Sequence, residues 1–354
     1  MKKVEYNQLG LFNTKWQKGV PLNFSKSPGE HLTWIGALSF EERCLGSIYT
    51  SLSSHLKSLL LINYSTKLSS IEQGEKLRMK HKNRLIKHLE FSNPNLLLTE
   101  KTVNAYSRSL LLKILDGFLQ KLLENDPNQL ISVVIDISCL TKIHTIYSIL
   151  WCLNNPKVIN TYILYTRPQT YGSPKQTHGG PSAGWIHTII NPLKISKKPI
   201  TTEFNIPITY CIYLMGHEGD RARAALFNLP IDILYGIFVL SPNEPRLEER
   251  CRIENEDIIR DIERKKVLGA KIIECEIMDN DFLLQTLENN LSKINDMNSL
   301  IYFLPLGPKP LILTSVLAFW KFASVDVEVV YPIPVVYDIN YTYGIREVFS
   351  IKIK

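Results

Sequence analysis

The chain lacks the features that define several large classes of protein. Its 354 residues contain no apolar run of the roughly 18 to 20 residues that a membrane-spanning helix needs. Six cysteines are present, but no two form a C-x-x-C pair, so neither a zinc ribbon nor a disulfide framework is indicated. The sequence contains no G-x-G-x-x-G fingerprint and no Walker A loop. The polar N-terminus has no signal-peptide pattern, and we expect a cytoplasmic protein with no cofactor and no membrane partner.

The composition is that of a globular protein, with 45% hydrophobic and 21% charged residues. At about 150 residues per domain, two domains are expected. Residues 1–200 hold 25 Lys and Arg against 12 Asp and Glu, a net charge of +13, whereas residues 201–354 hold 16 against 22, a net charge of −6. The first half would attract a polyanion. The two halves could equally attract each other, or the charge could serve solubility alone.

Short apolar runs alternate with helical patterns along the chain. Strands are predicted at about 31–37, 59–64, 95–99, 129–137, 158–166, 208–215, 231–240, 271–278, 300–305 and 325–331. Helices are predicted at about 70–90, 103–125, 141–153, 219–228, 245–268, 281–295 and 310–322. This alternation predicts an α/β protein with two tandem Rossmann-like, doubly wound, mainly parallel sheets. Ser39 is expected to cap a further short helix, with Glu42 completing a capping box.

Four segments follow from this pattern. Residues 1–30 form an irregular N-terminal arm, and residues 31–170 form a basic Rossmann-like domain. Residues 171–205 are rich in Pro, Gly, Ser and Lys and are predicted to be a linker and loop, with room for one short strand near 186–194. Residues 206–354 form an acidic Rossmann-like domain, whose tail alternates enough to form a hairpin or an edge pair.

Three features of the first half recur in the same order in the second. A strand ends at a glycine followed by Glu and Arg, as GALSFEER at 36–43 and GHEGDR at 216–221. A later strand leads to a lysine directly before a helix, Lys142 and Lys309. The last feature is a Y-x-x-P-x-x-Y segment, at 165–171 and 331–337. We infer an internal duplication that forms a pseudo-two-fold pair of domains.

The repeated features lie at the carboxyl ends of predicted strands, where open α/β sheets bind ligands. Amides at a helix N-terminus can hold an anion, arginines can grip a phosphate, and tyrosine rings can stack on a base. The pattern therefore predicts a site for a nucleotide or another phosphorylated small molecule. The candidate ligand-binding residues are Gly36, Ser39, Arg43, Ser138, Thr141, Lys142, Tyr171, Gly216, Glu218, Arg221, Gly307, Lys309 and Tyr337.

Each of these residue types also has a structural interpretation. A Glu–Arg pair beside the first strand can simply fix a helix, and the tyrosines can pack in the core with a hydroxyl at its rim. The lysines can be solvated, although a cation at a helix N-terminus opposes the helix dipole. A residue type that opposes a local preference at two equivalent places favours a functional role.

Three acids are candidates for catalysis if the protein is an enzyme: Asp136, Glu41 and Glu218. Asp136 ends the most apolar strand of the first half, where it could orient Lys142, act as a general base or serve as a structural cap. Glu218 and its neighbours His217 and Asp220 resemble metal ligands, but the other histidines show no ligand spacing. We therefore predict no metal site.

A basic segment at 76–88 holds six Lys and Arg and no acid. Lys80, Lys82 and Arg84 could lie along the phosphates of a nucleic acid. The segment has no interleaved aromatic residues, so readout of bases is not indicated. A solvated helix face is the alternative interpretation.

The segments GALSFEER (36–43) and DISCLTK (136–142) resemble the CRISPR-associated Rossmann-fold (CARF-like) ligand-sensing domains of prokaryotic defence systems. The resemblance extends over both halves. It implies that a first-strand loop and a later strand–lysine–helix loop face a two-fold axis, where a cyclic oligonucleotide binds. Members of that family usually append an effector domain, and this chain ends within the second predicted sheet, so the resemblance implies a separate effector protein as partner.

Three hypotheses about function follow. The first is a sensor or regulatory subunit of a bacterial anti-phage defence or stress system that binds a nucleotide-type anion between its two halves. The second is a nucleotide or nucleic-acid hydrolase that uses the three acids. The third is a protein-interaction module of a larger defence complex, suggested by the uneven charge.

Overall fold

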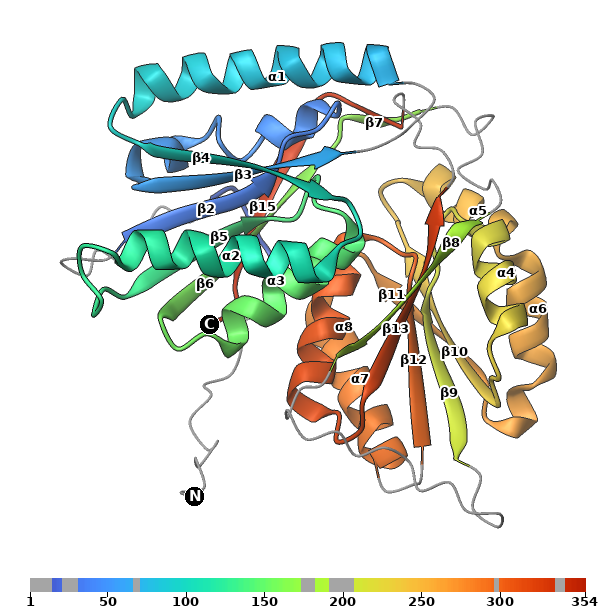
Figure 1. Cartoon of the computed structure of the whole chain (residues 1–354). Helices are drawn as coiled ribbons and strands as arrows, with labels where there is room; N and C mark the ends of the chain where they lie inside the picture. The colour runs from blue at the N-terminus through green and yellow to red at the C-terminus, as the bar shows by residue number, and fades with distance from the viewer. Residues whose placement is uncertain are drawn as a thin grey trace, which may run out of the picture.

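The computed structural model describes the side chains of residues 15–20, 31–65, 72–172, 207–294, 299–334 and 341–354, and the backbone of Ile71, 182–190 and Asn295. Two α/β units lie side by side, the first mainly in blue to green but including the red strand at 347–352, and the second mainly in yellow to red (Figure 1). In the described part of the chain, no helix combines the length and the apolar character needed to cross a membrane. All six cysteines are unpaired, as the sequence predicts.

Among the described residues, seven strands form the sheet of the first unit, in the order β1-β15-β6-β5-β2-β3-β4. The middle strands pair in parallel, and β15 adds to β6 in the antiparallel direction. The strands are β1 (Gln17–Lys18), β2 (His31–Ala37), β3 (Ser58–Ser65), β4 (Leu97–Asn104), β5 (Ile131–Asp136), β6 (Val158–Arg167) and β15 (Glu347–Lys352). The helical elements are the 3-10 turns η1 (Glu42–Leu45) and η2 (Ser51–His55) and the helices α1 (Ile71–Ser92), α2 (Arg108–Leu123) and α3 (Lys142–Asn154).

Six described strands form the second sheet, in the order β11-β10-β9-β12-β13-β8, and here β8 is the antiparallel strand. The strands are β8 (Ser182–Ile190), β9 (Ile208–Leu214), β10 (Ile233–Leu240), β11 (Lys271–Glu276), β12 (Ser299–Pro305) and β13 (Val327–Pro334). The helical elements are α4 (Gly219–Asn228), α5 (Pro245–Glu254), α6 (Glu256–Arg264), η3 (Lys266–Leu268), α7 (Asn280–Asn295) and α8 (Lys309–Phe322). Two short strands, β7 (Thr170–Tyr171) and β14 (Thr342–Tyr343), pair separately.

The two sheets match in six of their strands, and β1 of the first sheet has no counterpart in the second. β4-β3-β2-β5-β6 in the first unit corresponds to β11-β10-β9-β12-β13 in the second, and each series ends in one antiparallel strand, β15 or β8. The carboxyl ends of parallel strands lie at the same edge of a sheet, so each unit presents five loops at one edge. The predicted α/β architecture with mainly parallel sheets is confirmed.

The two units meet through α3 and α8, the helices that follow β5 and β12. Most residues of both helices are buried, and the majority of those buried residues are apolar. A largely buried helix of this kind must be covered on most of its faces. Here the two helices pack against their own sheets and against each other, and Trp320 of α8 donates a hydrogen bond to Asn154 at the end of α3 over 3.3 Å.

Two predictions are corrected by the structure. The tail does not stay with the second unit, because β15 pairs with β6 and extends the first sheet. The strand expected near 186–194 in the segment between the units is present as β8, which pairs with β13. Ser39 does not cap a helix: its hydroxyl accepts a hydrogen bond from the amide of Glu41 over 3.1 Å, and only the short turn η1 follows.

Truncation of a side chain in β15 tests whether the tail completes the first unit. Ile351 is 2% exposed, and replacing a buried isoleucine with alanine removes contacts that the surroundings only partly recover. We expect Ile351→Ala to lower the free energy of unfolding by about 2–4 kcal/mol, measured by urea unfolding followed by tryptophan fluorescence. Val267→Ala, at a side chain 95% exposed, should change it by less than about 0.5 kcal/mol. Equal effects would contradict the packing of β15.

Candidate functional site

The loops at the carboxyl ends of all ten parallel strands surround a cavity of about 280 Å³. Its volume is close to the lower end of the range for small-molecule sites, roughly 300 to 1,000 Å³. In the first unit the lining comes from the loops after β2, β4 and β5 and from the ends of β3 and β6. In the second unit it comes from the matching positions around β9, β11, β12, β10 and β13. The cavity is therefore shared by both units.

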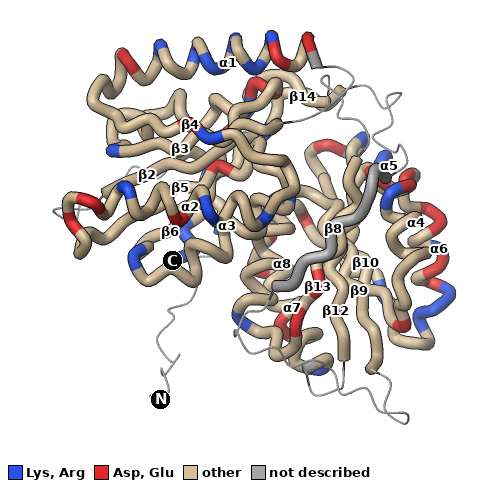
Figure 2. The backbone as a smooth tube through the Cα atoms, viewed as in Figure 1, with Lys and Arg blue, Asp and Glu red and all other residues tan. Residues whose placement is uncertain are grey.

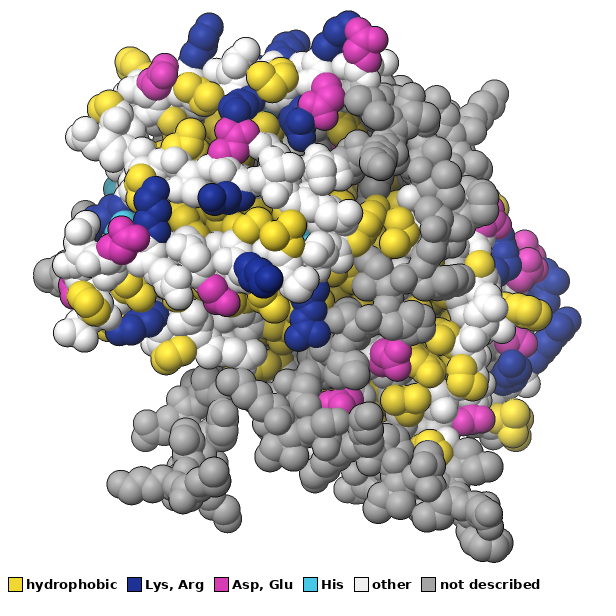
Figure 3. Space-filling model, in the orientation of Figure 1, with side chains coloured by type: hydrophobic (Ala, Val, Ile, Leu, Met, Phe, Trp, Pro, Cys, Tyr) yellow, Lys and Arg dark blue, Asp and Glu magenta, His cyan; other side chains and the backbone are white. Residues whose placement is uncertain are grey.

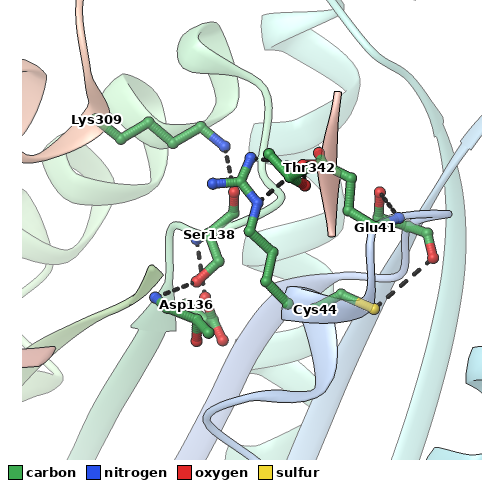
Figure 4. A network of polar contacts seen from close by, with 9 residues as sticks. Glu41, Cys44, Asp136, Ser138, Lys309 and Thr342 are labelled. Carbon is green, nitrogen blue, oxygen red and sulfur yellow. Dashed lines mark hydrogen bonds and ion pairs between the residues drawn. The ribbon is translucent and has the colours of Figure 1, made fainter. Parts of the chain in front are cut away.

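Two lysines cross between the units in a reciprocal arrangement. Lys142 begins α3 in the first unit, and its Nζ donates to the carbonyl of Leu306 in the second unit over 2.6 Å. Lys309 begins α8 in the second unit, and its Nζ donates to the carbonyl of Ser138 in the first unit, also over 2.6 Å (Figure 4). Each lysine thus holds the loop that leads into the helix of the other. Both lysines lie at helix N-termini, as the sequence predicts.

A Glu–Arg pair flanks the cavity in each unit. In the first, the guanidinium of Arg43 contacts Glu41 over 2.8 and 2.9 Å, and the hydroxyl of Thr342 donates to the same carboxylate (Figure 4). In the second, Arg221 contacts Glu218 over 2.6 Å. Both arginines are buried, with 7% and 2% of their surface exposed. A buried guanidinium without a counter-charge is strongly destabilising, so Glu41 and Glu218 stabilise the two arginines in these positions.

The Glu218–Arg221 pair of the second unit also contacts one of the crossing lysines, Lys142. Lys142 Nζ lies 3.5 Å from the carboxylate of Glu218, which also holds Arg221. Burial lowers the pKa of Lys142, and the neighbouring Glu218 opposes that shift. Burial and the nearby guanidinium of Arg43 lower the pKa of Lys309 to about 7. The cavity therefore holds cations that lack full compensation, and a bound anion would supply it.

Tyrosine side chains from both units line the same cavity. Tyr171 of β7 packs edge-on against Tyr341, with ring centroids 5.9 Å apart. Tyr165 and Tyr331 lie at the ends of β6 and β13 and are buried. Burial raises the pKa of Tyr64, whose hydroxyl accepts a hydrogen bond from the amide of Thr141 over 3.1 Å. These rings can contact the flat face of a base.

Most of the predicted ligand-binding residues meet at this cavity, although they come from distant parts of the chain. Those that line it are Ser39, Arg43, Thr141, Lys142, Tyr171, Gly216, Glu218, Arg221, Gly307 and Lys309, together with the candidate acid Glu41. Ser138 is not among the lining residues, but its carbonyl accepts the hydrogen bond of Lys309. Tyr337 lies outside the described residues.

Asp136 does not reach the cavity lining. It is 2% exposed, and its carboxylate accepts hydrogen bonds from the hydroxyl of Ser47 and from the amide of Ser138, the latter over 2.8 Å. Burial raises its pKa. Lys142, which we expected Asp136 to orient, contacts Leu306 and Glu218 instead. Asp136 therefore acts as the cap of the loop after β5, which was the structural interpretation of this residue.

Two predicted glycines are explained by close packing. A side chain at Gly36 would overlap the indole ring of Trp34, with a Cβ only 2.3 Å from the ring. A side chain at Gly216 would overlap the carbonyl of Leu306, at 2.2 Å. Gly216 thus lets the loop after β9 approach the loop that Lys142 holds. Its contribution to the site is this close approach.

The helix amides that we expected to hold an anion are partly committed to protein partners. At the start of α3, the amide of Thr141 donates to Tyr64, and the amide of His144 donates to the hydroxyl of Thr141 over 3.2 Å. That hydroxyl in turn donates to the carbonyl of Ala105 over 2.7 Å. The side-chain cations, more than the helix amides, are therefore the groups available to an anion.

Three other lining residues were not predicted from the sequence: Tyr64, Arg78 and Tyr341. Tyr341 reaches the site because the tail returns to the first unit, where the neighbouring Thr342 contacts Glu41. Tyr64 and Arg78 come from the end of β3 and from α1. Tyr64 ends a predicted apolar strand and Arg78 belongs to the basic segment, but their convergence on one cavity depends on tertiary structure.

The basic segment lies on α1 (Figure 2), where Arg78 lines the cavity and the other basic residues of the segment do not. Acids from outside the segment pair with several of its cations: Lys82 with Glu100, and Arg84 with Glu42 over 2.6 Å. Lys80 is exposed. Along this upper edge, cations are interspersed with acids and hydrophobic groups and form no continuous basic surface (Figure 3). Phosphate contacts by Lys82 or Arg84 would require these pairs to open.

Neither a family model nor a curated protein matches this chain. The assignment of a function therefore depends on the geometry of the cavity.

The pair in the second unit can be tested by neutralising its acid. Glu218→Gln leaves the buried Arg221 and the adjacent Lys142 without a counter-charge. We expect it to lower the free energy of unfolding by about 2–3 kcal/mol, less than for a fully buried pair because Glu218 is 17% exposed. Chemical denaturation measures the change.

An exposed ion pair supplies the matched control. Glu256→Gln breaks a surface contact with Arg260 on α6, and its effect should stay below about 0.5 kcal/mol. Indistinguishable effects of the two substitutions would contradict the structural role of Glu218.

The lowered pKa of Lys309 predicts a pH-dependent stability. The folded protein releases this proton near pH 7, whereas the unfolded chain holds it up to about the ordinary value of 10.5. Between these values the unfolded state binds more protons, so a rise in pH stabilises the folded state through this group. The free energy of unfolding of the native protein should therefore rise relative to that of Lys309→Met between pH 7 and about 9.5, by up to about 1.4 kcal/mol per pH unit.

Denaturant unfolding across this pH range measures the difference. Lys265→Met, at an exposed lysine after α6, should differ from the native protein by a constant amount. A constant difference for Lys309→Met as well would mean that the lysine is charged in the folded state.

Proposed function

We propose that the protein is a receptor for a small anionic ligand of the nucleotide type, which binds in the cavity between its two units. The observation that carries this proposal is the reciprocal crossing of Lys142 and Lys309, which gathers cations from both units at one place. A ligand held there contacts both units at once. Binding can therefore change how the units are held together, which is the property that a sensor or regulatory subunit needs.

The charge of the cavity suits a ligand with two anionic groups. Two lysines and three arginines line the cavity with three glutamates, a formal excess of two positive charges when both lysines are protonated. Phosphates are held well by such groups, because arginine offers a planar pair of donors and lysine a mobile charge. The tyrosines on the walls supply surfaces for bases or other flat groups.

The matching strand orders support the internal duplication that the repeated motifs predict. They also agree with the resemblance to CARF-like sensor domains, which implies a cyclic oligonucleotide as ligand and a separate effector as partner. We therefore propose a regulatory role in a prokaryotic defence or stress system, in which the ligand is the signal and a partner protein carries out the response.

A hydrolase remains the second candidate function, since Glu41 and Glu218 lie at the cavity. Both carboxylates are occupied by buried arginines, however, and neither is free to take up a proton without disturbing its pair. Asp136 is engaged elsewhere. The geometry therefore favours binding over hydrolysis.

Ligand binding can be tested by thermal-shift screening and calorimetry with cyclic oligonucleotides, NAD and nucleoside triphosphates. A ligand present at 100 times its dissociation constant should stabilise the protein by about 2.7 kcal/mol. Lys142→Met and Lys309→Met should each weaken binding at least about tenfold, because each removes a cation that faces the ligand. Lys80→Met, on the outer face of α1, is the control and should leave binding unchanged.

Failure of every phosphorylated compound to stabilise the native protein would overturn the proposal. Turnover of a bound nucleotide that is lost in Glu41→Gln or Glu218→Gln, with binding retained, would favour the hydrolase instead.

A further inference from the structure

The charged centre of the cavity is nearly symmetric between the units, but its two flanks are not. The first flank is the lining from β3, α1 and the loop after β4, and the second flank is the lining from β10, α5 and the loop after β11. The two sides can be compared because the five parallel strands of each sheet follow the same order. The seventh residue of β3 is Tyr64, and the seventh residue of β10 is Val239. The first residue after β4 is Ala105, and the first after β11 is Ile277. All four line the cavity.

The largest difference lies on the helix that follows the second strand of each unit. In the first unit, α1 contributes Glu75 and Arg78, which form an ion pair. In the second unit, the first two turns of α5 contribute Leu247 and Cys251. One flank therefore carries a guanidinium and a carboxylate, and the other is mainly apolar.

The first flank is held in place by further contacts. Arg78 also donates to the carbonyl of Tyr64 over 3.2 Å, and its side chain remains 24% exposed. The hydroxyl of Tyr64 lies 3.1 Å from Nδ1 of the buried His144. The flank therefore combines a fixed aromatic ring with a charged pair beside it, and the guanidinium has N–H groups beyond those used in these contacts.

We propose that the two flanks bind different bases, a guanine against Tyr64, Arg78 and Glu75 and an adenine in the apolar flank of the second unit. Guanine presents two acceptors, O6 and N7, that match the paired donors of an arginine. Its ring and exocyclic N–H groups are donors that a carboxylate accepts. Adenine replaces the O6 acceptor with an amino donor, which an arginine cannot satisfy.

The second flank has the opposite preference. Val239, Leu247 and Ile277 offer surface to a flat ring. Of the polar side chains beside them, His217 already contacts the carbonyl of Leu247 over 3.1 Å, and Ser241 offers a single hydroxyl. A polar group buried without a partner costs free energy, and guanine has more such groups along its edge than adenine. This assignment rests on the proposed function, since it specifies the bases of the nucleotide ligand. The ligand class is a guanine–adenine dinucleotide with two phosphates.

Calorimetry with three cyclic dinucleotides tests the assignment: the guanine–adenine compound, the di-adenine compound and the di-guanine compound. The mixed compound should bind at least about tenfold more tightly than either symmetric one. In Arg78→Leu, the preference for the mixed compound over the di-adenine compound should fall to less than about threefold. Arg260→Leu, at an exposed ion-paired arginine on α6, should keep the native preference, and thermal melts establish that both variants fold.

The outcomes separate this inference from the proposed function. Similar affinities for all three compounds, or a preference that survives in Arg78→Leu, would overturn the assignment of the bases and leave the receptor intact. Tightest binding of either symmetric compound would also overturn it. If the native protein binds none of the three nor any other phosphorylated compound, the receptor function itself fails, and the assignment fails with it.

Discussion

The structure depends on charges that are buried between two units and must find partners there. Lys142 and Lys309 extend from the N-termini of α3 and α8, where the helix dipole disfavours a cation. Each donates a hydrogen bond to a carbonyl of the opposite unit, and Lys142 also lies 3.5 Å from the carboxylate of Glu218. This mutual requirement fixes the angle and register at which the units meet. The apolar faces of α3 and α8 supply the contact area, but apolar packing alone would tolerate other orientations.

The same requirement bears on the proposed binding of an anion. A carbonyl carries only a partial charge, so it compensates a buried lysine incompletely, and burial together with the nearby Arg43 lowers the pKa of Lys309 to about 7. A phosphate carries full charge and would compete with the carbonyls of Leu306 and Ser138 for both lysines. The contacts that join the units are therefore the ones that a ligand would exchange. Binding and the arrangement of the units are physically linked at this point.

The sequence was sufficient for the layered α/β architecture, because buried parallel strands appear as apolar runs and the repeated lysines mark the helices that face each other. Most of the residues that it singled out for ligand binding do line the cavity, since strand ends converge in this type of sheet, but they make up only about a third of the lining. It was not sufficient for the tail. The alternation in β15 identifies an edge strand but not which sheet it joins, and only tertiary packing decides that β15 adds to β6. Asp136 was ambiguous because a loop cap and a general base have the same local sequence.

The uneven charge shows how far a formal count can differ from the electrostatics of a surface. The excess of +13 in residues 1–200 suggests a basic face. On α1, however, Lys82 and Arg84 are matched by acids that other elements bring to them. Inside the cavity, by contrast, cations exceed acids. Glu41 and Glu218 compensate Arg43 and Arg221, and the charges of Lys142 and Lys309 remain in excess. A few partly compensated charges in a low-dielectric site act more strongly on an anion than many screened charges at the surface, so the cavity is where the charge of this protein has its largest effect.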